Sequence, residues 1–284
     1  MKRYKLFIDG EYVDPVGGEW IESIDPYRGE AWAEIPRGSS QDVDKAVSAA
    51  HGAMTQGAWS QMSPSARGKL LVKLSDLISE NAEQLAAIEV RDNGKLYTEM
   101  LGQVRYKAEW WRYFGGMADK MEGSVVPIDK PDIFAFTTTI PVGVVAALTA
   151  WNSPLMFIAW KCAAALAAGC AVVVKPSEFA SASTLEFASL TQRAGLPKGV
   201  FNVVTGLGSE AGATLVSHPR VAKISFTGSD ETGARVYESG ARNIKRVALE
   251  LGGKSANIVF DDADQEQAWR GLYPVSSRQL VKVA

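Results

Sequence analysis

One stretch of this sequence, residues 141–178, constrains the possible folds more than any other. It opens with an apolar run of strand length at residues 142–150. Pro154 then marks a first helical turn, and residues 155–168 are apolar on nearly every face. A second run, rich in β-branched residues, follows at 171–174. The pattern predicts two parallel strands joined by a buried crossover helix.

Polar residues follow each of these two predicted strands. Trp151 and Asn152 come after the first strand, and Lys175, Ser177 and Glu178 come at the end of the second. In an open parallel sheet, ligands bind in the crevice beyond the carboxyl ends of the strands. We therefore expect these five residues to lie on one rim of the sheet.

The alternation of strands and helices continues after residue 178. Predicted helices cover residues 182–193, 212–217 and 232–239, and predicted strands cover 200–204, 223–226 and 247–249. Strands separated by helices at this spacing predict an α/β fold with a doubly wound parallel sheet.

Two glycine-containing segments open helices in this region. Gly208 and Gly212 belong to the first segment, and Gly228 and Ser229 to the second. Free backbone amides and the helix dipole at such positions favour a phosphate. A single pattern of this kind is more often a plain tight turn. Two of them in one sheet, with Glu178 ending a neighbouring strand, favour a dinucleotide.

The part of the chain before residue 141 predicts short strands followed by helices. An Asp9-Gly10 turn predicts a hairpin over residues 5–13, with further short strands to about residue 35. Helical spacing predicts helices around residues 43–50, 63–85 and 95–121. The last of these is rich in aromatic residues, which we interpret as core or interface packing. Residues 123–140 alternate weakly and predict a β-arm that reaches another module or subunit.

Composition limits the classes of partner. The chain has 284 residues, 46% hydrophobic and 22% charged, which is enough for two domains. Its net charge of −2 gives no electrostatic reason to expect nucleic acid or a membrane as partner. Neither a signal peptide nor a membrane span is recognisable. The two cysteines, Cys162 and Cys170, lie in and after the apolar helix, which favours buried reduced thiols over a disulfide or a metal ligand. We expect a cytoplasmic protein without a metal site.

Four blocks, in this order, resemble the aldehyde dehydrogenase superfamily: Trp151-Asn152-Ser153-Pro154, Val174-Lys175-Pro176-Ser177-Glu178, Phe226-Thr227-Gly228-Ser229 and Leu249-Glu250-Leu251-Gly252-Gly253-Lys254. The resemblance covers about residues 4–264, and the last block is the most specific. It implies oxidation of an aldehyde to a carboxylic acid through a cysteine thioester, with hydride transfer to a nicotinamide. It also implies a small-molecule aldehyde as substrate and a homodimer or homotetramer as the assembled form.

The resemblance implies two catalytic residues. Asn152 matches the side-chain amide that stabilises the oxyanion, although by spacing alone it could equally cap the following helix. Glu250 matches the glutamate that activates water for thioester hydrolysis. The alternative is that Glu250 is only a solvated residue at a strand end. This is the poorer interpretation, because the pair Gly252-Gly253 that follows permits a ligand to approach the backbone closely.

The resemblance also implies a set of cofactor-binding residues. They are Trp151, Lys175, Ser177, Glu178, Gly208, Gly212, Phe226, Thr227, Gly228, Ser229, Thr232, Leu251 and Gly252. Glu178 would accept hydrogen bonds from the adenine ribose and repel a 2′-phosphate, so NAD is favoured and NADP stays possible. For Trp151 a core role is a fair alternative.

The sequence departs from the family in one respect that bears on activity. The family nucleophile lies after the glutamate in a Gly-Gln-x-Cys block, and no cysteine follows Cys170. Cys162 and Cys170 are poor substitutes because burial disfavours a thiolate. We therefore expect a cofactor-binding domain formed by residues 1–122 and 141–264, an oligomerisation arm at 123–140, and an aberrant tail at 265–284 in place of the catalytic domain. An inactive dinucleotide-binding fragment is the alternative to an active dehydrogenase. A short-chain dehydrogenase is a weaker one, because the first turn is not glycine-rich.

The tail suggests a reading-frame shift. Codons can be chosen for residues 274–284 that are consistent with the genetic code. Reading them from the third nucleotide of the Pro274 codon gives Gly-Ile-Phe-Ala-Ala-Thr-Gly-Gln-Ser-Cys, which resembles the family's nucleophile block. We place the shift between Asp264 and Gly271, and sequencing the gene tests it.

Overall fold

A computed structural model of the chain describes residues 1–254, 256 and 258–270. Its centre is a seven-stranded sheet in the order β12-β11-β8-β9-β10-β2-β3. The parallel strands are β8 (Val144–Thr149), β9 (Ala171–Pro176), β10 (Phe201–Val203), β11 (Val221–Thr227) and β12 (Arg246–Glu250). The predicted doubly wound α/β sheet is confirmed.

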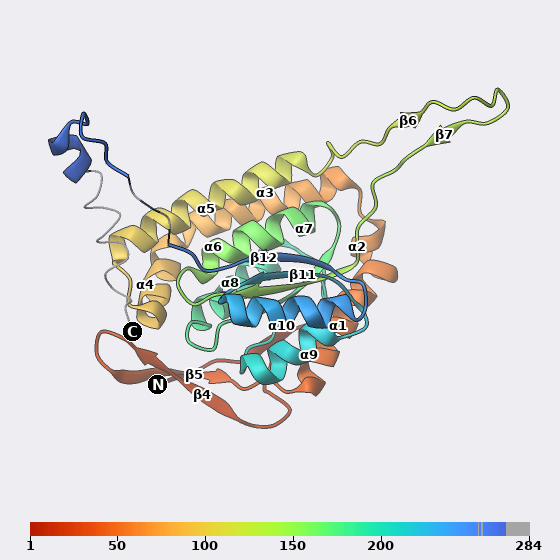
Figure 1. The fold of residues 1–284 in the computed structure, drawn as a ribbon. Helices are drawn as coiled ribbons and strands as arrows, with labels where there is room; N and C mark the ends of the chain where they lie inside the picture. Colours follow the sequence, from red (N-terminus) through yellow and green to blue (C-terminus); the bar gives the residue numbers. More distant parts are fainter. Residues whose placement is uncertain (255, 257, 271–284) are drawn as a thin grey trace.

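Helices cover both faces of this sheet (Figure 1). One face carries α1 (Ser40–Thr55), α9 (Ala213–Ser217) and α10 (Asp230–Ala241). The other carries α8 (Ala182–Ala194) and the crossover helix, with α3 (Pro64–Glu80), α4 (Ala82–Asn93) and α5 (Tyr97–Met117) packed outside them. In β9, Val172 and Val174 enter the core on the crossover side, while Val173 enters the core on the α1 side. A strand buried on both faces explains the uninterrupted apolar run in the sequence.

The crossover helix is not a uniform α-helix. It consists of α6 (Pro154–Ile158), a π-helical segment η1 (Ala159–Ala163) and α7 (Ala164–Ala167). A single helix over residues 155–168 was expected. The apolar periodicity carries no signal for the wider turn, and π-helical turns often occur at functional sites.

The helix predicted over residues 63–85 is two helices, so that prediction was wrong. They are α3 (Pro64–Glu80) and α4 (Ala82–Asn93), and a short helix α2 (Ala58–Gln61) precedes them. Asn81 separates the two long helices, and its side-chain amide donates to the carbonyl of Leu77 at 2.7 Å. The same carbonyl, in the last turn of α3, also accepts the backbone N–H of Asn81 at 3.1 Å, so both donors of Asn81 bond the end of the helix. The next helix, α5, covers Tyr97–Met117.

The N-terminal hairpin is confirmed and forms one edge of the central sheet. Strands β2 (Leu6–Ile8) and β3 (Glu11–Val13) pair across Asp9 and Gly10, whose φ angles are 54° and 75°. Two positive φ angles are typical of a type I′ turn, and Asp-Gly accepts them at little cost. β2 then pairs antiparallel with β10, a contact that the sequence did not predict. A separate small sheet contains β1 (Lys2–Arg3), β5 (Glu30–Pro36) and β4 (Trp20–Asp25).

The predicted β-arm projects from the rest of the molecule (Figure 1). It contains β6 (Val125–Val126) and β7 (Ala135–Phe136), which pair only with each other among the described strands. Its apolar side chains, including Val125, Phe134 and Phe136, are exposed.

Candidate active site

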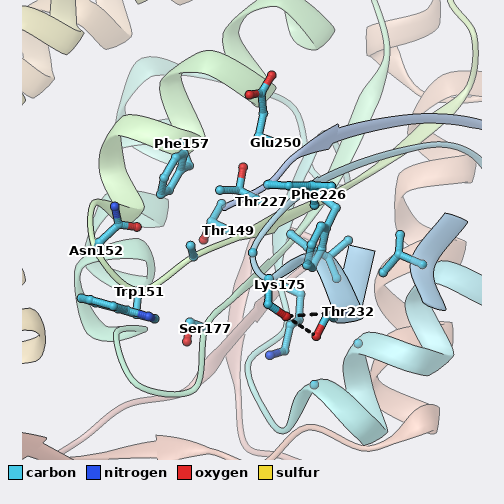
Figure 2. Close-up of a pocket in the computed structure, with 18 of the residues that line it drawn as sticks. Thr149, Trp151, Asn152, Phe157, Lys175, Ser177, Phe226, Thr227, Thr232 and Glu250 are labelled. Carbon is cyan, nitrogen blue, oxygen red and sulfur yellow. Dashed lines mark hydrogen bonds between the residues drawn. The ribbon is translucent and has the colours of Figure 1, made fainter. Parts of the chain in front are cut away.

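A cleft of about 1360 Å³ lies beyond the carboxyl ends of β8, β9, β11 and β12. Every residue that the sequence predicted for catalysis or cofactor binding lines it. Figure 2 shows Trp151 and Asn152 at one side of this cleft and Phe226 and Thr232 at the other. The cleft therefore lies where it was expected, beyond the carboxyl ends of the parallel strands, because such strands bring these ends to one edge of the sheet.

Asn152 lies between β8 and α6 and is half-buried. The N-cap position of α6 belongs to Ser153, and no side chain caps that helix. Among the described residues, Asn152 is hydrogen-bonded through its backbone carbonyl and not through its side-chain amide. The capping alternative for Asn152 is therefore wrong. Its amide is available to a ligand in the cleft.

Lys175 and Glu178 form an ion pair at the end of β9. The ammonium of Lys175 donates to a carboxylate oxygen of Glu178 at 3.0 Å, and the backbone N–H of Gly208 lies 3.4 Å from the other oxygen. Burial alone would raise the pKa of Glu178, but Lys175 and these hydrogen bonds hold it below its ordinary value. Burial lowers the pKa of Lys175, and Glu178 opposes that effect. The pair fixes an acceptor carboxylate on the rim of the cleft.

Two glycines of the cleft, Gly208 and Gly212, leave room for a small group beside the backbone. A Cβ built on Gly208 or Gly212 would have no neighbour closer than 3.9 Å. Gly212 also has ordinary helical angles, with φ −64° and ψ −51°. Neither packing nor backbone strain therefore requires glycine at position 212. Glycine allows a ligand to approach the backbone closely, so the two positions fit a dinucleotide.

The first turn of α10 borders the cleft, which Ser229 and Thr232 line. Its N-cap is Ser229, whose hydroxyl accepts the backbone N–H of Thr232 at 3.3 Å. The other N–H groups of the first turn have no partner within the helix, which makes a suitable site for a phosphate. The preceding Gly228 N–H donates to the carbonyl of Glu250 at 3.1 Å, so this turn is tied to the end of β12.

Glu250 is the last residue of β12, and its side chain is exposed at the cleft. Lys161, in the π-helical turn, donates to the hydroxyl of Ser225 at 3.1 Å. Burial lowers the pKa of Lys161 to about 8, and the charge of Glu250 acts in the opposite direction. Glu250 therefore places an exposed carboxylate at the cleft, while Lys161 is not among the residues that line it.

The two cysteines are buried and free, as predicted. Burial raises the pKa of Cys162 to about 12, so this thiol does not ionise near neutral pH. Neither cysteine lines the cleft.

Some residues that line the cleft were not predicted. Phe157 and Trp160 come from the crossover helix and pack against each other with ring centroids 5.8 Å apart. Glu99 comes from the first turn of α5 and Lys95 from the connection just before it, and their charged groups lie 3.5 Å apart. Helical spacing from Asn152 could have indicated the two aromatic residues. Nothing in the local sequence connects Lys95 to this site, because the contact depends on how α4 and α5 pack.

The sequence that forms this cleft matches a known family. The profile described as the aldehyde dehydrogenase family matches residues 12–277. The chain belongs to the aldehyde dehydrogenase family. This match extends past residue 264, where the sequence blocks had suggested that the resemblance ends. The predicted aberrant tail falls mostly on residues 271–284, which lie outside the described residues, and the frameshift remains a prediction.

Relatives in the family are similar to nearly the whole of this chain. A (Z)-2-((N-methylformamido)methylene)-5-hydroxybutyrolactone dehydrogenase of Acinetobacter baylyi is 49% identical over 94% of this chain and 54% of its own length. Aldehyde dehydrogenase family 2 member C4 of Arabidopsis thaliana is 44% identical over 94% of this chain and 54% of its own length. The NAD⁺ complex of a Bacillus cereus aldehyde dehydrogenase superposes with a TM-score of 0.93 at 42% identity, over 95% of this chain and 55% of that one.

The chain thus spans about half the length of the family members that it matches. Within the part of the chain that the structure describes, no helix is long and apolar enough to cross a membrane.

Proposed function

We propose that this chain binds NAD in the cleft and forms the cofactor-binding part of an enzyme that oxidises an aldehyde to a carboxylic acid. One observation carries the proposal. Gly208 and Gly212 leave room for a ligand beside the ion pair of Glu178 and Lys175, in which Glu178 supplies an acceptor carboxylate. The protein's own packing does not need that space, whereas a dinucleotide does. The NAD⁺ complex of the Bacillus cereus relative supports the same ligand.

The chain's own residues would hold NAD in two places. Glu178 would accept hydrogen bonds from the adenine ribose, with Lys175 keeping the carboxylate charged and oriented. The free N–H groups at the start of α10, next to Gly228 and Ser229, would receive the pyrophosphate. Trp151, which lines the cleft, would bound the space available to the cofactor. A 2′-phosphate would meet the negative charge of Glu178, so NAD is favoured over NADP.

The reacting end of the cleft would be served by Asn152 and Glu250. When bound, NAD supplies the hydride acceptor. The amide of Asn152, with no partner of its own among the described residues, would donate to the oxyanion formed on the aldehyde carbon. Glu250 would take a proton from the water that hydrolyses the acyl intermediate.

This chemistry also needs a thiolate that neither cysteine of this sequence provides. Cys162 is buried with a raised pKa, and Cys170 is buried outside the cleft. The nucleophile would therefore come from a segment outside this sequence. A dinucleotide-binding chain without turnover of its own is the second candidate function, and it rests on the same observation.

We also propose that residues 1–122 and 141–264 form one cofactor-binding domain and that residues 123–140 mediate assembly. The shared core supports the first part, since Trp59 of α2 and Val172 of β9 belong to the same buried cluster. The exposed apolar side chains of the arm support the second part.

Calorimetric titration of the chain with NAD and with NADP tests the proposal. We expect saturable binding of NAD and weaker binding of NADP, with no NADH formed when aldehydes are added. Absence of NAD binding would exclude both candidate functions. The opposite outcome is that the chain alone forms NADH from an aldehyde and loses this activity in Cys162→Ser or Cys170→Ser. That result would contradict a nucleophile from outside this sequence.

A further inference from the structure

The C-terminal end of α4 lies against the loop that carries Asn152. Asn93 is the last residue of α4 and is completely buried. Gly94 follows with a φ of 71°, so the chain leaves the helix in a left-handed turn that brings Lys95 back toward the same loop. These residues are distant in sequence from Asn152, and their contact with it depends only on tertiary packing.

Two donors converge on the backbone carbonyl of Asn152. The side-chain amide of Asn93 donates to it at 3.3 Å, and the hydroxyl of Ser153 donates to it at 2.6 Å. The ammonium of Lys95 lies 3.3 Å from the hydroxyl of Ser153 and supports that hydroxyl as a donor. The peptide unit after Asn152 is therefore held from two sides.

The orientation of the Asn93 amide is itself fixed. Its oxygen accepts the backbone N–H of Lys95 at 3.0 Å, so the nitrogen must face Asn152. The ammonium of Lys95 is held in turn by Glu99 at 3.5 Å. A buried carbonyl and a buried amide that satisfy each other are costly to separate.

A second residue of α4 lies near the other end of the loop. Glu89 is buried, and the backbone of Leu155, in the first turn of α6, favours its charged form, although burial raises the pKa of Glu89 overall. Residues 152–155 therefore meet α4 at the carbonyl of Asn152 and again beside Leu155.

We propose that Asn93 and Lys95 are positioning residues for Asn152. They fix the backbone at Asn152, and the fixed backbone directs its side-chain amide into the cleft instead of toward α6. The inference rests on the oxyanion role proposed above for Asn152. Preorganisation of such a donor matters because its effect falls steeply when it is displaced.

Nuclear magnetic resonance of the full chain tests whether Asn93 and Lys95 position Asn152. The side-chain amide signals of Asn152 are assigned by their absence in Asn152→Ala. We expect a single pair of signals in the unmodified chain. Asn93→Asp keeps the shape and the acceptor for Lys95 but places an oxygen against the carbonyl of Asn152. It should shift the pair or split it into several.

Asn202→Asp is the matched control. Asn202 is also completely buried and also donates to backbone carbonyls, those of Val172 and Gly199, but it lies outside the cleft. We expect this variant to leave the signals of Asn152 in place. An equal change in both variants would mean a global effect and would overturn the proposal.

Lys95→Met covers the case in which Asn93→Asp does not fold, because Lys95 is only partly buried. This variant should shift the Asn152 signals less than Asn93→Asp does. If the signals are unchanged in every folded variant, Asn93 and Lys95 do not position Asn152. Titration of the unmodified chain with NAD separates this proposal from the proposed function. If the chain does not bind NAD but Asn93→Asp still changes the Asn152 signals, the proposed function is rejected and the positioning of Asn152 stands.

Discussion

The ammonium of Lys175 and the carboxylate of Glu178 lie 3.0 Å apart at the end of β9. The side chain of Lys175 is only 5% exposed, whereas that of Glu178 is 25% exposed. The lysine therefore holds the pair from inside the protein, and the carboxylate faces the cleft. Since the pKa of Glu178 is held below its ordinary value, a negative charge stands on this rim at neutral pH.

Glu178→Gln tests what that charge does. The variant should bind NAD about tenfold more weakly, because a hydrogen bond to a charged group contributes about 1.5–3 kcal/mol. It should bind NADP as well as or better than the unmodified chain, because the repulsion of the 2′-phosphate is removed. Calorimetry with both cofactors measures the change in preference.

Glu210→Gln is the control for Glu178→Gln. Glu210 lies in a second π-helical segment, η2 (Gly208–Gly212), and pairs with Arg37 on the surface. This variant should keep the preference for NAD. If Glu178→Gln leaves the ratio of the two affinities unchanged, Glu178 does not select the cofactor.

Gly212→Ala should separate folding from binding. A Cβ at this position has room, and alanine in a helical conformation is favoured over glycine by about 0.5–1 kcal/mol. The variant should therefore melt at the same or a higher temperature. It should bind NAD at least several-fold more weakly, because the methyl group occupies space next to the backbone that the dinucleotide needs.

Gly102→Ala is the matched control for Gly212→Ala. Gly102 lies in α5, where a Cβ would meet no neighbour within 4 Å, and it is not part of the cleft. We expect the same gain in melting temperature with unchanged NAD affinity. Full NAD affinity in Gly212→Ala would show that the open space does not receive the cofactor.

Glu89 predicts a pH-dependent stability. Burial raises its pKa from 4.5 to about 8, and nearby Asp92 adds to the effect. Between these two values the unfolded chain has lost the proton of Glu89 while the folded chain keeps it. Stability contributed by the protonated group is therefore complete below about pH 4.5 and is lost as the pH rises toward 8.

Glu89→Gln mimics the protonated form and should remove this loss. The melting temperature of the variant, relative to the unmodified chain, should rise steadily across the same pH window. Glu83→Gln, on the exposed surface of the same helix, should give a flat difference. A flat difference for Glu89→Gln would mean that Glu89 titrates normally in the folded chain.

Glu250 can be tested once a nucleophile is supplied, for example by joining the chain to the remaining half of a relative. In such an enzyme, Glu250→Gln should still give a burst of NADH and then a slow steady state, because hydrolysis of the acyl intermediate would be impaired. Asn152→Ala should lower the burst rate itself by about 10²-fold. A normal steady state in Glu250→Gln would reject its role as base.

Several features of the fold follow from short-range patterns and were predicted from the sequence. The Asp9-Gly10 hairpin depends on two residues that accept positive φ angles. The run at 171–174 gives a strand buried on both faces because every residue in it is apolar. The place of the cleft follows from a general property of parallel sheets.

Other features depend on contacts between distant segments, and only the tertiary structure decided them. The break at Asn81 and the π-helical turn at 159–163 leave no trace in the apolar periodicity. The pairing of β2 with β10 joins residues nearly two hundred positions apart.

The site shows the same division between sequence and tertiary structure. The chain's motifs predicted a large part of the cleft lining, because each motif sits at the end of its own strand, but they did not predict Phe157, Trp160, Lys95 or Glu99. What those residues can do was decided by neighbours from elsewhere in the chain. Asn93 holds the backbone of Asn152, and the backbone N–H of Gly208 helps to hold the pKa of Glu178 below its ordinary value. Burial, charge and hydrogen-bond partners are properties of the packed chain, and a local sequence pattern does not contain them.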